Sequence, residues 1–269
     1  MADSRLTEHV IERSGSPIHY WVGGPAGGKP IVLTHGALVD HTMFDEQVKA
    51  LIGEYRVVTW DMRGHGKSRP IIGKFTVPGA MDDLIAILDQ EGIKTSIQVG
   101  QSTGTYISQE LVFRHPERVE ALIVIDGTCI TMSLPKFQEL LLKSAPLMLR
   151  LYQFEAMKKM SSQGSSIKKD VQQYIYDEMT KIGREDVINI MSGVTACVHG
   201  EPGYTIKQPM LLVHGDQDKL GNIAQIAPVW AKRDPHVTYE IIPNAGHNSN
   251  QDNPEAFNKV MMAFLKASV

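Results

Sequence analysis

A serine that could act as a nucleophile lies between two glycines, in the stretch Gly100-Gln101-Ser102-Thr103-Gly104. The residues before it, 96–99, have the pattern of a strand, and residues 105–114 carry apolar side chains at helical spacing. A Gly-x-Ser-x-Gly pattern between a strand and a helix is typical of a nucleophile elbow, a strained turn that projects the serine hydroxyl. The two glycines let neighbouring backbone come close, because they carry no Cβ atom. We therefore predict that Ser102 is a catalytic nucleophile.

A serine hydroxyl is a weak nucleophile at neutral pH, so it needs a base and a carboxylate that orients the base. In elbow enzymes these partners follow the serine along the chain, first the acid and then the histidine. A buried strand at 208–215 leads into a loop that contains Asp218, and a strand at 237–242 is followed by His247. The carboxyl ends of parallel strands meet at one edge of a sheet, and binding and catalytic residues of α/β proteins usually lie there. The order therefore predicts a catalytic triad of Ser102, Asp218 and His247.

Two backbone N–H groups are candidates for an oxyanion hole. In elbow enzymes one donor is the residue after the nucleophile, which here is Thr103. The other donor comes from the loop after an earlier strand, and here the apolar strand 31–34 ends in His35-Gly36-Ala37. We predict that the N–H groups of Ala37 and Thr103 stabilise negative charge that develops on a substrate oxygen.

The chain resembles the α/β-hydrolase-fold superfamily over nearly its whole length. The residues that carry the resemblance are His35-Gly36, Asp61 to Ser68, the elbow at Ser102, Gly215 to Asp218, and Gly246-His247. The resemblance implies an α/β protein with a mostly parallel, twisted sheet flanked by helices. It also implies a helical cap inserted after strand six and an esterase-like or lactonase-like serine hydrolase.

The acid of the triad has two other candidates. In similar proteins the second acidic residue of a Gly-Asp-x-Asp loop is the triad acid, which favours Asp218. Asp216 stands two residues earlier and could instead stabilise the loop. Asp126 ends the strand 123–125, where some similar hydrolases carry their acid.

The other histidines and the cysteines indicate no second chemistry. His35, His65 and His214 each adjoin a glycine in a turn after a strand, so we expect them to serve backbone geometry. The histidines lack ligand spacing with an acidic partner, and no metal site is predicted. Cys129 and Cys197 have neither metal-binding nor redox spacing. A serine triad requires no cofactor, and we predict none.

Strands and helices alternate along the chain, with one interruption. The predicted elements outside it are a hairpin of strands 8–12 and 18–22, strands 31–34, 55–59 and 121–125, helices near Met43 and at 78–90, and a last helix from Asn253-Pro254. The interruption is helical, with segments at 135–151, 167–182 and 187–194 and a polar breaker at 161–166. We predict a core domain formed by residues 1–130 and 203–269, and a helical cap, or lid, at 131–202.

Composition limits the class of partner. The chain has 269 residues, of which 42% are hydrophobic, and a net charge of −3, so no strongly basic face is implied and nucleic acid is not an expected partner. The N-terminus lacks the apolar core of a signal peptide, and no apolar run approaches a membrane span. We expect a cytoplasmic protein that acts on a small molecule, and the oligomeric state stays open.

The predicted reaction is the hydrolysis of a carboxylic ester or lactone of small to medium size and largely apolar character, through an acyl-enzyme. A serine at the elbow argues against opening epoxides or haloalkanes, which similar proteins do with an aspartate nucleophile. The same triad could instead cleave a carbon–carbon bond or an amide, or support perhydrolysis. A further alternative is a slow-turnover ligand receptor or signalling protein of the same fold.

Overall fold

The computed structural model describes residues 4–269, except the side chains at 138, 139, 141, 143 and 145–147. Its centre is an eight-stranded sheet in the order β1-β2-β4-β3-β5-β6-β7-β8. The strands are β1 (Thr7–Arg13), β2 (Ser16–Gly23), β3 (Pro30–Thr34), β4 (Arg56–Trp60), β5 (Ser96–Gln101), β6 (Val119–Ile125), β7 (Met210–Gly215) and β8 (Val237–Ile242). Strand β2 runs antiparallel to β1 and β4, and the pairs from β4 to β8 are parallel. This arrangement confirms the mostly parallel α/β sheet.

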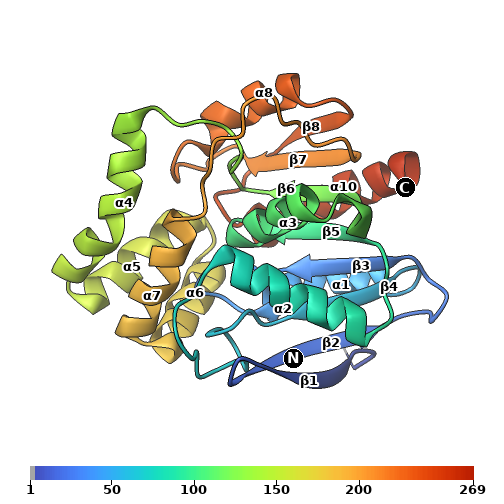
Figure 1. Cartoon of the computed structure of the whole chain (residues 1–269), viewed down its shortest axis with the longest axis horizontal. Coiled ribbons are helices and arrows are strands. Elements are labelled where there is room, and N and C mark those ends of the chain that lie inside the picture. The colour runs from blue at the N-terminus through green and yellow to red at the C-terminus, as the bar shows by residue number, and fades with distance from the viewer. Residues whose placement is uncertain (1–3) are drawn as a thin grey trace.

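Helices cover both faces of this sheet (Figure 1). Helices α1 (Asp45–Leu51) and α10 (Pro254–Ser268) lie on one face, and α2 (Val77–Gln90) and α3 (Thr103–Arg114) lie on the other. Helix α8 (Ile223–Arg233) packs against β7 and β8, and the short helices are η1 (His41–Phe44), η2 (Pro116–Arg118) and α9 (Ser249–Asp252). As predicted, α10 begins at Asn253-Pro254, where the Asn253 side chain accepts a hydrogen bond from the N–H of Ala256.

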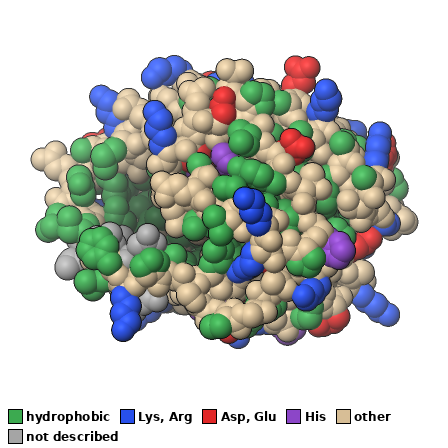
Figure 2. All heavy atoms as spheres, turned by 90° about the horizontal axis from the view of Figure 1, so that it is seen from above, with side chains coloured by type: hydrophobic (Ala, Val, Ile, Leu, Met, Phe, Trp, Pro, Cys, Tyr) green, Lys and Arg blue, Asp and Glu red, His purple; other side chains and the backbone are tan. Residues whose placement is uncertain are grey.

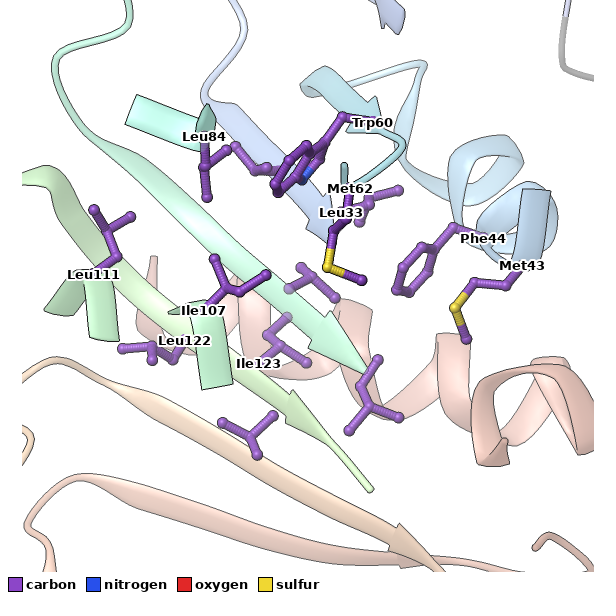
Figure 3. Packing of buried hydrophobic residues seen from close by; sticks show 14 of the residues in the cluster. Leu33, Met43, Phe44, Trp60, Met62, Leu84, Ile107, Leu111, Leu122 and Ile123 are labelled. Atoms are coloured by element: carbon purple, nitrogen blue, oxygen red, sulfur yellow. The ribbon is translucent and has the colours of Figure 1, made fainter. Parts of the chain in front are cut away.

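The central strands are buried on both sides, which explains their nearly continuous apolar sequences. All residues of β5 and β7 are buried, as are six of the seven residues of β6. Figure 3 shows Leu33 of β3 and Ile123 of β6 in one cluster with Ile107 and Leu111 of α3. This packing holds the carboxyl ends of the strands, and the loops that follow them, in fixed relative positions.

Four helices stand between β6 and β7: α4 (Lys136–Leu151), α5 (Phe154–Ser165), α6 (Lys169–Ile182) and α7 (Arg184–Thr195). In Figure 1 this four-helix insertion lies beyond the ends of the sheet to which the strand arrows point. These four helices lie within residues 131–202, the range that the sequence predicts as a cap. No helix within the described residues is both long and apolar enough to cross a bilayer.

The polar breaker predicted at 161–166 is wrong, because α5 continues to Ser165. Two serines of this stretch bond back to the helix, with Ser162 Oγ donating to the carbonyl of Lys159 at 3.1 Å and Ser165 Oγ donating to the carbonyl of Ser161 at 2.8 Å. Helix α5 packs against α6 and buries Met157. Tertiary packing therefore outweighs the weak helical preference of serine and glycine.

Hydrogen bonds tie the insertion to the core at several places, of which two involve the carboxylates of Asp252 and Asp40. Asp252, at the end of α9, accepts the N–H groups of Gly246 at 2.7 Å and Ile167 at 3.1 Å and the hydroxyl of Ser166. On α6, the Tyr174 hydroxyl donates to the carboxylate of Asp40 at 2.8 Å. The loop between α5 and α6 is thus fixed to the loop that begins at Gly246.

Candidate active site

Ser102 lies at the sharp turn between β5 and α3, as the elbow pattern predicts. Its backbone has φ 48° and ψ −112°, a strained conformation for a residue with a side chain. A Cβ atom at Gly104 would come within 2.0 Å of the Thr34 carbonyl oxygen, and one at Gly100 within 2.4 Å of the Gly104 backbone. Both glycines are therefore needed to bring β3, β5 and α3 together around Ser102.

His247 and Asp218 come together from the loops after β8 and β7. His247 Nδ1 lies 3.0 Å from Asp218 Oδ2, and the Asp218 side chain is inaccessible to solvent. The other Asp218 oxygen, Oδ1, accepts the N–H of Leu220 at 2.9 Å, which fixes the carboxylate. Burial opposes a charged imidazole, but the hydrogen bond and charge of Asp218, helped by the charge of Asp126, raise the pKa of His247 above its ordinary value. The pair can therefore hold a proton on His247.

The two other candidate acids bond elsewhere. Asp126 is fully buried and accepts the N–H of Gly215 at 3.0 Å, and both the N–H and the hydroxyl of Ser249, at 2.8 and 2.7 Å. Burial, together with the nearby Asp218 charge, raises the pKa of Asp126 to about 7. Asp216 is exposed and accepts the N–H of Ala245 at 3.0 Å. Both side chains brace the loops that carry Asp218 and His247, and among the described contacts the His247 ring bonds only to Asp218.

The two predicted oxyanion donors, Ala37 and Thr103, line the same cavity as Ser102 and His247. Thr103 is the first residue of α3, so its N–H has no carbonyl acceptor within the helix and lies at the positive end of the helix dipole. Gly36, next to Ala37, approaches Gln101 so closely that a Cβ atom would lie 2.0 Å from Gln101 Oε1. Gln101 Nε2 in turn donates to the His247 carbonyl at 2.7 Å, which connects three parts of the site.

His35 has the backbone role that its position suggested. Its Nε2 accepts the N–H of Met62 at 3.0 Å, and Nδ1 lies 2.7 Å from the Gly36 carbonyl oxygen, to which it donates. Burial lowers the pKa of His35, so the ring stays neutral and keeps one donor and one acceptor. His35 therefore shapes the loop that presents Ala37.

A cavity of about 730 Å³ opens in front of these groups. Four of its lining residues are the predicted Ala37, Ser102, Thr103 and His247. The others are Leu38, Val39, Gln101, Tyr106, Thr128, Cys129, Leu134, Leu142, Ser161, Ser165, Ile175, Met191, Val194, Thr195, Val198, Leu220, Gly221, Asn222, Ile223 and Asn248. No Lys, Arg, Asp or Glu is among these described lining residues, and the surface is mainly apolar.

A second polar cluster, which the sequence did not suggest, joins Asp40, His41 and Asp61, with possible ligand atoms within 4.8 Å of one another. These groups already have hydrogen-bond partners, and Asp40 Oδ1 accepts the N–H of Thr42 at 3.0 Å and the Tyr174 hydroxyl at 2.8 Å. Asp61 Oδ1 accepts the N–H of His41 at 2.9 Å and lies 2.8 Å from His41 Nδ1, while Oδ2 accepts the N–H of Lys67 at 2.7 Å. The His41 ring also stacks on Trp21 with centroids 3.5 Å apart. The cluster therefore braces a turn.

Sequence comparisons agree with this fold. The α/β hydrolase fold family matches residues 29–254, and the chain belongs to that family. Human Epoxide hydrolase 4 is 25% identical over an alignment of 296 positions, gaps included, which spans 99% of this chain and 81% of that protein. A 2-hydroxy-6-oxononadienedioate/2-hydroxy-6-oxononatrienedioate hydrolase of Burkholderia vietnamiensis is 27% identical over an alignment of 288 positions, gaps included, which spans 98% of this chain and 96% of that protein.

Solved structures show the same fold at lower sequence identity. A thermophilic esterase from Thermogutta terrifontis superposes with a TM-score of 0.82 at 20% identity, covering 98% of each chain. An enol-lactonase from Burkholderia xenovorans LB400 also superposes with a TM-score of 0.82, at 23% identity, covering 96% of this chain and all of the other. The chain is thus a hydrolase-fold protein whose relatives act on several kinds of bond.

Proposed function

We propose that this protein is a serine hydrolase that cleaves an uncharged carboxylic ester or lactone of small to medium size through an acyl-enzyme. The observation that carries the proposal is the 3.0 Å contact between Asp218 and His247 beside a cavity that Ser102 also lines. A strained serine, a histidine and a buried carboxylate in this relation are the parts that nucleophilic acyl transfer needs.

In the proposed reaction, His247 Nε2 accepts the proton of Ser102 as Oγ attacks the carbonyl carbon. Asp218 keeps the other ring nitrogen, Nδ1, protonated and stabilises the imidazolium that forms. The N–H groups of Ala37 and Thr103 stabilise the oxyanion, a role for which one donor is worth roughly 3–4 kcal/mol. Protonated His247 then gives its proton to the leaving alcohol, and water repeats the sequence to release the acid and regenerate Ser102.

The chemistry of the cavity supports an uncharged substrate. A dioate such as the one named for the Burkholderia vietnamiensis relative carries two carboxylates, which proteins bind with Arg or Lys. The described lining offers neither residue, and its polar groups include Thr128 and Asn222, 3.2 Å apart between Thr128 Oγ1 and Asn222 Oδ1. An ester or lactone with apolar substituents fits this surface better than a dicarboxylate does.

The nucleophile also disfavours epoxide opening, despite the name of the human relative. Attack by a serine oxygen on an epoxide carbon would leave an alkyl ether, which has no carbonyl group for water to attack. Attack on an ester leaves an acyl-enzyme that water can hydrolyse. Ser102 therefore favours carbonyl substrates.

We also propose that the four-helix insertion is the cap of the site. It contributes described residues of α4, α6 and α7 to the cavity, among them Leu142, Ile175 and Met191. Apolar and flexible side chains such as Met191 can adapt to acyl groups of different shape. The cap would then determine which acyl group the enzyme accepts.

The test is labelling with a fluorophosphonate probe, followed by turnover of p-nitrophenyl butyrate and of the same ester with a terminal carboxylate on the acyl chain. We expect Ser102→Ala to abolish labelling and turnover. The matched control is Ser161→Ala, which removes another hydroxyl from the cavity wall and should leave labelling intact. We expect the neutral ester to be preferred. Labelling that survives in Ser102→Ala contradicts the nucleophile, and preference for the charged ester contradicts the substrate class.

A further inference from the structure

The outer surface of the insertion carries a concentration of exposed apolar side chains. Seven of the eleven exposed large hydrophobic residues in the described part of the protein lie between residues 137 and 167. Figure 2 shows hydrophobic side chains around a hollow at the end of the molecule where Figure 1 places α4–α7. A surface of this kind usually marks an interaction site.

Four of these side chains form a row along α4, which we call the α4 stripe. Phe137, Leu140, Met148 and Leu151 are 70%, 65%, 50% and 74% exposed. At 100° per residue they fall within one narrow arc of the helix. Leu142 points to a different side of the helix and lines the cavity. Helix α4 therefore has one apolar side toward the cavity and another toward solvent.

Two basic residues lie beside the α4 stripe. Lys136 and Arg150 are fourteen residues apart, close to four helical turns, so they lie along one side of the stripe, and both are exposed. In the described part of the chain neither side chain forms an ion pair with an acidic residue. Residues 136–170 contain seven Lys or Arg and three Asp or Glu, a net charge of +4 in a chain of net charge −3.

From this combination of exposed apolar and basic side chains we infer that the α4 stripe docks the protein on an anionic lipid surface. The apolar side chains enter the boundary between headgroups and acyl chains, and Lys136 and Arg150 contact the acidic headgroups. An anionic bilayer has a negative charge that attracts Lys136 and Arg150, whereas the stripe of a second copy of this chain would carry the same positive charge and repel them. The charge therefore favours a bilayer over a second copy. Docking would place the wall of the cavity that contains Leu142 next to the membrane. The inference is independent of the proposed function, because it concerns binding alone.

The test is co-sedimentation of the full chain with vesicles of ether-linked phosphatidylcholine, with or without ether-linked phosphatidylglycerol. Ether lipids carry no carboxylic ester, so hydrolysis cannot confuse the result. We expect binding to the vesicles that contain phosphatidylglycerol and weaker binding at high salt. Lys136→Gln with Arg150→Gln should reduce partitioning at least tenfold, since each basic residue near such a surface contributes about a factor of five.

Leu140→Ser with Leu151→Ser should also reduce partitioning at least tenfold, because both side chains leave water on docking. The matched controls are Lys259→Gln with Lys266→Gln, and Val229→Ser, which change exposed residues of α10 and α8 and should bind as the parent does. Circular dichroism should show the same melting temperature for all variants. Absence of vesicle binding, equal binding without phosphatidylglycerol, or stripe variants that change only the oligomeric state would each overturn the inference.

Discussion

Replacement of Asp218 by Asn tests the central contact of the site. The substitution keeps the shape of the side chain but lets its amide donate to His247 Nδ1, now 3.0 Å from a carboxylate oxygen. The ring would then carry its proton on Nε2 and could not accept the Ser102 proton. The imidazolium would also lose its buried counter-charge.

The expected cost follows from this geometry. In a serine triad, the loss of the correct tautomer lowers kcat by roughly 10³–10⁴, which corresponds to about 4–5 kcal/mol of transition-state stabilisation. Stability should change little, since the other Asp218 oxygen keeps its bond to the N–H of Leu220 at 2.9 Å. The assay is kcat/KM for p-nitrophenyl butyrate, with the melting temperature measured on the same samples.

Asp216→Asn and Asp126→Asn are the matched comparisons. Asp216 is exposed and bonds to the N–H of Ala245, so its variant should stay within a few-fold of the parent activity. Asp126 does not contact the His247 ring, so its variant should lose less activity than Asp218→Asn does. If Asp218→Asn stays within tenfold of the parent while Asp126→Asn loses a thousandfold, the acid has been assigned to the wrong residue.

Further predictions concern protons and backbone. Because the pKa of His247 is raised, the acid limb of the kcat/KM profile should have its midpoint above the ordinary value of 6.5; a midpoint below 6.5 would contradict this. Because the pKa of Asp126 is raised from 3.8 to about 7 on folding, the folded state loses stability through this group as pH rises across that range. In Asp126→Asn the denaturation midpoint should therefore depend less on pH between 3.8 and about 7 than it does in the parent. In urea titrations, the free energy of unfolding of Ser102→Gly should exceed that of Ser102→Ala by about 1 kcal/mol, because glycine adopts the positive φ of this position without strain. Gly104→Ala should cost about 1–3 kcal/mol in the same titrations, since its Cβ would meet the Thr34 carbonyl; an unchanged midpoint would refute that.

The sequence was informative where local patterns are tied to tertiary structure. Strand β5, the turn at Ser102 and helix α3 were predictable because glycine spacing, an apolar strand and helical periodicity agree in one short segment. The loops of Asp218 and His247 were predictable because each follows an apolar run that forms a buried or half-buried strand.

Other features depend on contacts between distant residues. Helix α5 contains a serine-rich stretch that local preference assigns to a loop, and only its packing on α6 makes it helical. The buried hydrogen bonds of Asp126 with Gly215 and Ser249 link residues about 90 and 120 positions apart, so no local sequence pattern predicts them. The same is true of Tyr174, whose partner Asp40 is 134 residues away.

Asp252 has a consequence for how this chain can be recombined with others. One carboxylate accepts hydrogen bonds from the backbone just before His247 and from the backbone just before α6, so the His247 loop and the insertion are held by the same side chain. In a chimaera whose insertion lacks counterparts of Ser166 and the Ile167 N–H, the Asp252 carboxylate would keep its hydrogen bond to Gly246 and lose the others. Such a transplant would disturb the loop that carries His247 even if every wall of the new pocket were intact.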